Sequence, residues 1–269
     1  MRPFAERLAT LTEARGRLCV GIDPHSATLA GWGLDDTVAG CERFARGLIE
    51  ALGEQVAAFK PQAAFFEAHG SAGVALLGRV LADISAVGAV SILDVKRGDI
   101  GSTMQAYARA YLGDGELAAD AVTLSPYLGF GALAPALELA AANGRGVFVL
   151  ARTSNPEGGG LQQAITAAGV SVAQGIVVAA NAANQTAGTP LAGLVIGATH
   201  ADSGVDLAGF DGWVLAPGIG AQGGTITGLQ ASFGAVYRRV LPSVSREIAA
   251  SGPEPTALRD RAAALTLTS

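Results

Sequence analysis

The chain has 269 residues and a formal net charge of −5 at pH 7; half of its residues are hydrophobic and only 15% are charged. Lys and Arg occur singly rather than in runs, which argues against a nucleic-acid partner. Apolar stretches reach about ten residues, whereas a bilayer-spanning helix needs roughly twenty, so we expect no membrane association. The length suits one large core, and we predict a single domain over residues 1–269.

The amino-terminal segment and the cysteines indicate a cytoplasmic protein. The first 17 residues mix charges of both signs among apolar positions, unlike a targeting segment. Cys19 lies in a strand-like run and Cys41 in a helical pattern, so we expect two reduced packing residues. The three histidines show no metal-ligand spacing, and we predict no metal site.

Apolar, β-branched runs alternate with stretches of helical period along the whole chain. This alternation is typical of repeated strand–helix units around a parallel sheet. Eight units in a chain of this length predict an α/β fold, a (β/α)8 TIM barrel, whose active site lies at the carboxyl ends of the strands. The predicted strands are residues 18–23, 56–60, 90–95, 121–124, 146–151, 193–197, 213–216 and, with the weakest pattern, 240–244.

Polar residues or glycine follow the last apolar residue of most predicted strands. A packing role alone does not explain this placement, which indicates a site at that end of the barrel. The residues are Asp23, Lys60, Asp94, Lys96, Ser125, Ser154, Thr199 and Gly218.

The segment SILDVKRGDIG, residues 91–101, places four charged residues directly after an apolar run. Side chains alternate along a strand, so Asp94 and Lys96 are expected on one face, with Asp99 just beyond the strand. A lysine between two carboxylates stays protonated at neutral pH, which suits a proton donor. An ion-pair network that closes the strand end is the structural alternative.

A glycine-dense segment, PGIGAQGG, follows the seventh predicted strand. Backbone N–H groups in such a turn can face an anion without obstruction from Cβ atoms. Barrels often bind phosphate after the seventh and eighth strands, and Arg246 follows the eighth. A tight loop and a surface arginine are the alternatives for these residues.

Three other segments predict local structure but no particular function. The connection of residues 152–192 is the longest and carries three glycines, so it is either a mobile flap or an ordinary crossover helix. Ser102 to Gln105 fit a capping box that starts a helix directly after Asp99. Residues 252–269 predict a final helix outside the barrel.

The string DVKRGDIGST, together with GIDPH early and LAPGIGAQGG late in the chain, resembles the orotidine 5'-phosphate decarboxylase family. The spacing resembles the longer bacterial branch, and the resemblance covers about nine tenths of the chain. Related sugar-phosphate decarboxylases and epimerases share the aspartate–lysine–aspartate string. Lys60 and the Gln222 loop narrow the resemblance to the orotidylate enzyme.

The resemblance implies a cofactor-independent lyase that converts orotidine 5'-phosphate to uridine 5'-phosphate in pyrimidine biosynthesis. Lys96 would be the proton donor, with Asp94 and Asp99 as its catalytic partners, and Asp99, Ile100 and Thr103 would reach across a homodimer interface into a shared site. The expected substrate-binding residues are Asp23 and Lys60 at the ribose, Ser154 (or Thr153) at the pyrimidine, Ile100 and Thr103 from the partner, and Pro217, Gly218, Gln222, Gly223 and Arg246 at the phosphate.

Three other functions fit the sequence less well. A magnesium-dependent sugar-phosphate decarboxylase or epimerase would carry an acidic residue at the second strand end, where this chain has Lys60. A non-catalytic nucleotide-binding barrel would have no use for the charged string. A Schiff-base aldolase needs a neutral lysine, whereas the carboxylates beside Lys96 keep it protonated and poorly nucleophilic.

Overall fold

The structure is a computed structural model that describes residues 2–200, 202–220 and 223–267. Parallel strands pair in chain order, and the pairing of the last strand with the first closes the barrel. The strands are β1 (Cys19–Ile22), β2 (Ala58–Pro61), β3 (Val90–Arg97), β4 (Ala121–Leu124), β5 (Gly146–Arg152), β6 (Ala192–Ile196), β7 (Val214–Pro217) and β8 (Val240–Val244).

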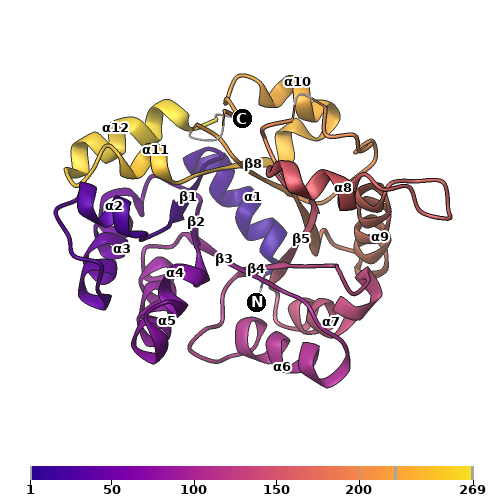
Figure 1. Ribbon diagram of the computed structural model, residues 1–269, viewed down its shortest axis with the longest axis horizontal. Coiled ribbons are helices and arrows are strands. Elements are labelled where there is room, and N and C mark those ends of the chain that lie inside the picture. The colour runs from indigo at the N-terminus through magenta and orange to yellow at the C-terminus, as the bar shows by residue number, and fades with distance from the viewer. Residues whose placement is uncertain (1, 201, 221–222, 268–269) are drawn as a thin grey trace.

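Helices surround this ring of strands (Figure 1). The α-helices are α1 (Phe4–Arg15), α2 (Ser26–Gly31), α3 (Val38–Leu52), α4 (Ala63–Glu67), α5 (Gly70–Ala86), α6 (Gly101–Leu112), α7 (Ala134–Ala142), α8 (Gly159–Gln162), α9 (Val172–Ala187), α10 (Leu229–Phe233), α11 (Arg246–Ala249) and α12 (Pro255–Leu265). The 3-10 helices are η1 (Phe130–Leu133), η2 (Pro156–Gly158) and η3 (Gly234–Arg239).

The predicted TIM barrel is confirmed, and all eight predicted strands are present. The weakly marked eighth strand lies where expected, paired with β7 and β1. The predicted final helix is α12, and the long connection contains α9, an ordinary crossover helix, preceded by η2 and α8. In the described ranges, no helix is both long and apolar enough to cross a bilayer.

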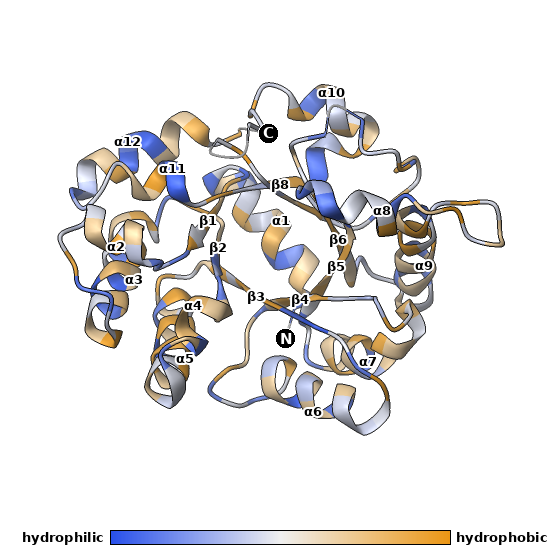
Figure 2. Cartoon of the chain, in the orientation of Figure 1, coloured by the Kyte–Doolittle hydropathy of each residue, from blue (hydrophilic) through white to orange (hydrophobic). Residues whose placement is uncertain are grey.

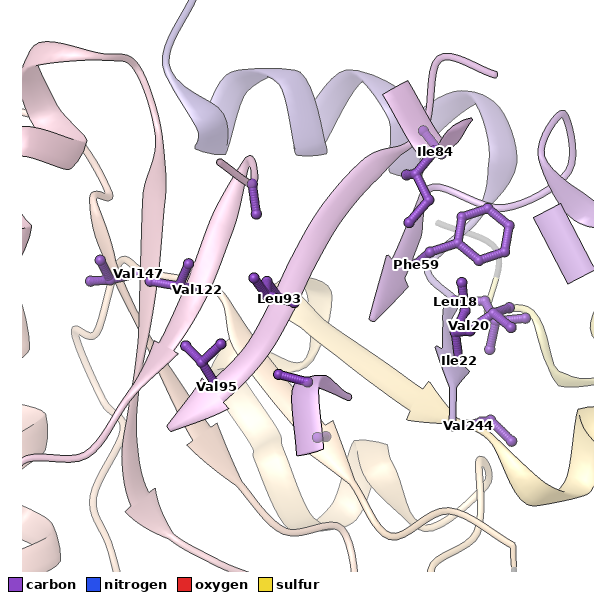
Figure 3. Close-up of a cluster of buried hydrophobic side chains, with 14 of the residues drawn as sticks. Leu18, Val20, Ile22, Phe59, Ile84, Leu93, Val95, Val122, Val147 and Val244 are labelled. Carbon is purple, nitrogen blue, oxygen red and sulfur yellow. The ribbon is translucent and has the colours of Figure 1, made fainter. Parts of the chain in front are cut away.

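Apolar packing on both faces of the strands explains why they form a barrel. Outward side chains such as Val20, Phe59 and Leu93 pack against the helices (Figure 3). Inward side chains such as Phe148 and Leu241 form a second cluster. Parallel strands buried on both faces require such continuous apolar runs. Figure 2 accordingly shows apolar β5 and β6, whereas hydrophilic residues are frequent on the surrounding helices.

Helix α1 packs against the amino-terminal side of the barrel and crosses behind the ring in Figure 1. The Phe4 ring meets the Phe148 ring edge-on, 6.0 Å between centroids. A Cβ atom on Gly146, the first residue of β5, would lie 2.4 Å from the Phe4 ring, so this close approach requires glycine. Arg7 on α1 also bonds Asp120, just before β4. With this end covered, the carboxyl ends of the strands are left to form the site.

Candidate active site

A cavity of about 530 Å³ opens among the carboxyl ends of the strands, within the usual size range of small-molecule sites. Eight of the predicted site residues line it: Asp23, Lys60, Asp94, Lys96, Ser154, Pro217, Gly218 and Arg246. The other lining residues are Gln62, Thr123, Leu150, Thr153, Asn155, Gly158, Gln162, Val195, Leu215, Ile219, Ser243 and Ser245.

Asp94 is the centre of the charged group in this cavity. Its Oδ2 lies 3.0 Å from Lys60 Nζ, and its Oδ1 lies 2.6 Å from Lys96 Nζ. The Thr123 hydroxyl donates a third bond to this carboxylate, with 2.7 Å between Thr123 Oγ1 and Asp94 Oδ1. Lys60 and Asp94 are buried, whereas the Lys96 side chain is 45% exposed. One carboxylate therefore bridges two cations of the cavity lining, one buried and one half-exposed.

Electrostatics keep the buried pair ionised. Burial of Asp94 favours its neutral form, but the charges of Lys60 and Lys96 and the hydrogen bonds outweigh burial and hold the pKa of Asp94 below its ordinary value. Burial of Lys60 likewise opposes its charge, but the charges of Asp94 and Asp23 raise the pKa of Lys60 above its ordinary value. The site thus contains permanent charges at neutral pH.

The backbone departs from regular strand geometry at Lys96. The register between β3 and β4 shifts between Leu93 and Arg97, and Lys96 has a φ of 47°. It is the one non-glycine residue with positive φ in the described part of the chain. Asp94 and Lys96 meet, as strand alternation predicted, but across a bulge rather than along a regular strand. Such strain, about 1–3 kcal/mol, persists where surrounding structure holds it.

Asp99, Ile100 and Thr103 lie beyond the strand end and do not line the cavity of their own chain. The predicted capping box is wrong: Ile100 is the N-cap residue of α6 and its side chain makes no capping bond. Asp99 Oδ1 instead accepts a bond from the Ile100 N–H at 2.7 Å. Among the described residues, Asp94 is the one carboxylate within ion-pair distance of Lys96, so Asp99 does not flank this lysine within one chain.

The glycine-dense loop after β7 contributes Pro217 and Gly218 to the cavity. Gly218 has a φ of 99°, and its carbonyl accepts a bond from the Gly224 N–H at 3.0 Å, so the loop turns back on itself there. Gly223 is exposed and outside the lining, and Gln222 lies outside the described residues. Arg246 begins α11 and is an exposed residue at the edge of the cavity.

The side of the cavity formed by the residues after β5 was only partly predicted. Thr153 donates its hydroxyl to Asn155 Oδ1 at 2.7 Å and accepts from Gln162 Nε2 at 2.8 Å, which ties η2 and α8 to the strand end. Ser154 lies beside Gly197, where a Cβ atom would be 2.7 Å from the Ser154 backbone. The first part of the long connection therefore forms one side of the cavity.

Several lining residues were not predicted, because most of them have the sequence pattern of core residues. Thr123 occupies a strand position that a buried β-branched residue would fill in any barrel. Leu150, Val195 and Leu215 likewise look like core residues, and their place beside the cavity depends on how far each strand extends. Gln62 follows β2 and Ser245 follows β8, so the position of each after a strand could have indicated it.

A further group of potential metal ligands lies away from this cavity. His69 Nε2 is 3.3 Å from Cys41 Sγ and 3.4 Å from Asp36 Oδ1. Asp36 also accepts a bond from the Ser26 hydroxyl at 2.5 Å. These side chains contact one another, and none of them lines the charged cavity.

A charged cavity at the carboxyl ends of a closed (β/α)8 barrel defines a TIM-barrel enzyme. Residues 16–260 match the model of the Orotidine 5'-phosphate decarboxylase / HUMPS family, and the chain belongs to this family. The curated relatives are named orotidine 5'-phosphate decarboxylase, so the chain is a carbon–carbon lyase.

The relatives match over nearly their whole length. The chain is 54% identical to the enzyme of Salinispora arenicola over 262 residues, 96% of this chain and 94% of the relative. It is also 54% identical to that of Salinispora tropica over 265 residues, 97% of this chain and 95% of the relative. A crystal structure titled as a putative orotidine 5'-phosphate decarboxylase from Streptomyces avermitilis has a TM-score of 0.92 at 51% identity, covering 99% of this chain and 94% of the other.

Proposed function

We propose that this chain decarboxylates orotidine 5'-phosphate to uridine 5'-phosphate in de novo pyrimidine biosynthesis, without a cofactor and with Lys96 as proton donor. The observation that carries the proposal is the Lys60–Asp94–Lys96 array in the barrel cavity of a family member. The catalytic unit is the single (β/α)8 domain of residues 1–269.

Decarboxylation breaks the bond between ring carbon and carboxylate, and the bonding electrons stay on the ring as carbon dioxide leaves. The Lys96 ammonium faces the cavity and stabilises this developing negative charge before donating a proton to the carbon. Its exposed fraction of 45% supports contact with the reacting carbon, whereas the largely buried Lys60 in the cavity wall is assigned to the ribose. Solvent then restores the proton to Lys96.

Asp94 serves as the fixed anion of the site. Its hydrogen bonds to Lys60, Lys96 and Thr123 hold the carboxylate in one orientation. A carboxylate beside the departing carboxylate disfavours bound substrate more than the transition state, in which that charge disperses. The lowered pKa of Asp94 supports this role, because the carboxylate stays ionised when an anionic substrate binds.

The remaining lining residues bind the non-reacting parts of the nucleotide. Asp23 and Lys60 bind ribose hydroxyls: Asp23 Oδ1 is buried with no hydrogen-bond partner among the described residues, as suits an acceptor reserved for substrate. Ser154 binds the pyrimidine, with Thr153 committed to the bonds of its own loop.

The phosphate is held by the loop after β7 and by Arg246. Pro217, Gly218 and Arg246 line the cavity, and the Gly218 N–H and the Arg246 guanidinium bind the phosphate. Gln222 and Gly223 are assigned to the phosphate by the family resemblance, although the Gly223 N–H is donated to the Gly220 carbonyl at 2.8 Å. Binding energy from this remote group positions the pyrimidine and offsets the cost of placing its carboxylate beside Asp94.

A homodimer completes each site. Asp99, Ile100 and Thr103 lie together at the start of α6, and Ile100 is 62% exposed. Tyr127 and Leu128, 76% and 52% exposed, follow the neighbouring strand β4. Exposed apolar side chains at the rim support a partner surface there. Asp99 of one subunit then pairs with Lys96 of the other, which gives that lysine its second carboxylate.

The direct test is an ultraviolet assay of orotidine 5'-phosphate turnover with and without excess chelator. We expect loss of substrate absorbance at the same rate in both, with uridine 5'-phosphate as product. Activity lost on chelation and restored by magnesium would favour the sugar-phosphate branch. A complete absence of turnover in folded dimer would contradict the proposal.

A further inference from the structure

The hydroxyl of Thr123 links the backbone of one proposed catalytic residue to the side chain of the other. Thr123 lies on β4 and is 1% exposed. Its Oγ1 accepts a bond from the Lys96 N–H at 3.0 Å and donates one to Asp94 Oδ1 at 2.7 Å. A hydroxyl has one donor and two acceptor sites, so both bonds can form at once.

The bulge in β3 explains why this hydroxyl is needed. Leu93 pairs with Val122 and Arg97 pairs with Leu124, so β3 uses four steps where β4 uses two. The backbone between these pairs is displaced from the regular ladder and needs other partners. The Lys96 N–H finds its partner in the side chain of Thr123, the residue that lies between Val122 and Leu124.

The same bond fixes the backbone that carries the proton donor. Lys96 is held at a φ of 47°, a strained conformation that a residue with a Cβ atom rarely adopts. Without the bond from its N–H, the backbone can relax to negative φ, and the direction of the Lys96 side chain changes with it. The distance of 2.6 Å between Lys96 Nζ and Asp94 Oδ1 depends on that direction.

We propose that Thr123 is a positioning residue for the decarboxylation, whose hydroxyl holds Lys96 and Asp94 in their reacting arrangement. This inference rests on the proposed function of Lys96. Thr123 acts through these two residues: it fixes the Lys96 backbone in the left-handed region and orients the Asp94 oxygen that faces the Lys96 ammonium. Threonine suits this position because its branched side chain has few χ1 rotamers and keeps the hydroxyl in place.

The test compares Thr123→Val, which keeps the shape and removes the hydroxyl, with Thr123→Ser, which keeps the hydroxyl. We expect kcat for orotidylate to fall about 100-fold in Thr123→Val, as for a misplacement near 1 Å, with KM within about threefold. Thr123→Ser should keep kcat within about threefold. Thr12→Val is the matched control: it removes another buried hydroxyl, bonded to the Ala9 carbonyl at the far end of the barrel, and should leave kcat unchanged.

Crystal structures of both variants provide a readout that does not depend on turnover. Residue 96 should move to negative φ in Thr123→Val and stay near its present value in Thr123→Ser. If Thr123→Val fails to fold, Thr123→Ala replaces it, with kcat expected to fall at least tenfold at similar KM. A kcat near that of the wild type in the hydroxyl-free variant, or an equal loss in Thr123→Ser, would overturn the proposal. Inactive wild-type protein would instead overturn the proposed function, and the two structures would still test the role of Thr123.

Discussion

Lys60 and Asp94 form a buried ion pair between neighbouring strands, with 3.0 Å between Nζ and Oδ2. The other oxygen of the same carboxylate, Asp94 Oδ1, lies 2.6 Å from Lys96 Nζ. The two lysines differ in exposure: 7% of the Lys60 side chain and 45% of the Lys96 side chain is accessible. Lys60 is therefore held against Asp94 in the cavity wall, whereas the Lys96 ammonium is the more accessible cation of the site.

Removal of Lys60 should destabilise the fold. Lys60→Met leaves the Asp94 carboxylate buried with one of its two cations gone, and loss of one partner of a buried pair costs about 3 kcal/mol. Urea unfolding followed by circular dichroism measures this loss. The double variant Lys60→Met/Asp94→Leu removes both charges and should be more stable than Lys60→Met alone. If the free energy of unfolding lost in the double variant equals the sum of the losses in the two single variants, the Lys60–Asp94 pair is not coupled and the prediction is wrong.

Asp94 should make stability depend on pH in acid. Burial, Lys60, Lys96 and hydrogen bonds together leave the pKa of Asp94 lower in the folded protein than its ordinary value of about 3.9 in an unfolded chain. A lowered folded pKa adds stability that is complete above the unfolded pKa and is lost as pH falls toward the folded pKa. Between about pH 5 and pH 2 the free energy of unfolding should therefore fall more steeply in wild type than in Asp94→Asn. Urea titrations at several pH values measure this free energy. An equal dependence on pH in wild type and Asp94→Asn would contradict a lowered pKa of Asp94.

The fold was predictable from sequence because each strand of a parallel barrel is buried on both faces and bounded by glycine, proline or polar residues. Even β8 (Val240–Val244), which contains Pro242, occupies its predicted residues. The cluster of Asp94, Lys96 and Lys60 was predictable too, because consecutive strands of a barrel end at one rim.

The rest of the site depends on interactions that no local pattern encodes. The bulge in β3 and the left-handed backbone at Lys96 arise from the pairing of two strands, so Thr123 looked like an ordinary core residue. The capping box at Ser102 was wrong because α6 already begins at Gly101, one residue beyond Ile100. The bonds of Thr153 within its loop depend on Gln162, nine residues away on a separate short helix.

Arg246→Ala should weaken substrate binding through the phosphate. A charge-assisted contact of about 1.5–3 kcal/mol corresponds to an increase in KM of about 10- to 100-fold. Orotidine, which lacks the phosphate, should be a poor substrate for wild type and variant alike, with little difference between them. Arg43→Ala, which removes an exposed arginine of α3 outside this cavity, is the matched control. An equal loss on both substrates would show that Arg246 does not bind phosphate.

Asp99 should act in the neighbouring subunit. Lys96→Ala and Asp99→Ala should each be inactive, and a mixture of the two should regain activity, because one site of each mixed dimer holds Lys96 and Asp99 intact. With free exchange, half of the dimers are mixed and half of their sites are whole, so about one quarter of wild-type activity should return. Mixed dimers confirmed by native mass spectrometry but still inactive would place Asp99 in the site of its own chain.

The kcat of Lys96→Ala with orotidine 5'-phosphate tests the role of Lys96 most directly. The substitution removes both the proton donor and the cation that faces the developing charge, so kcat should fall on the order of 10⁴-fold or more. Circular dichroism and thermal unfolding should show that the variant remains folded, because Lys60 and Thr123 still hold Asp94. A folded variant that retains kcat within about tenfold of wild type would contradict the assignment of Lys96 as proton donor.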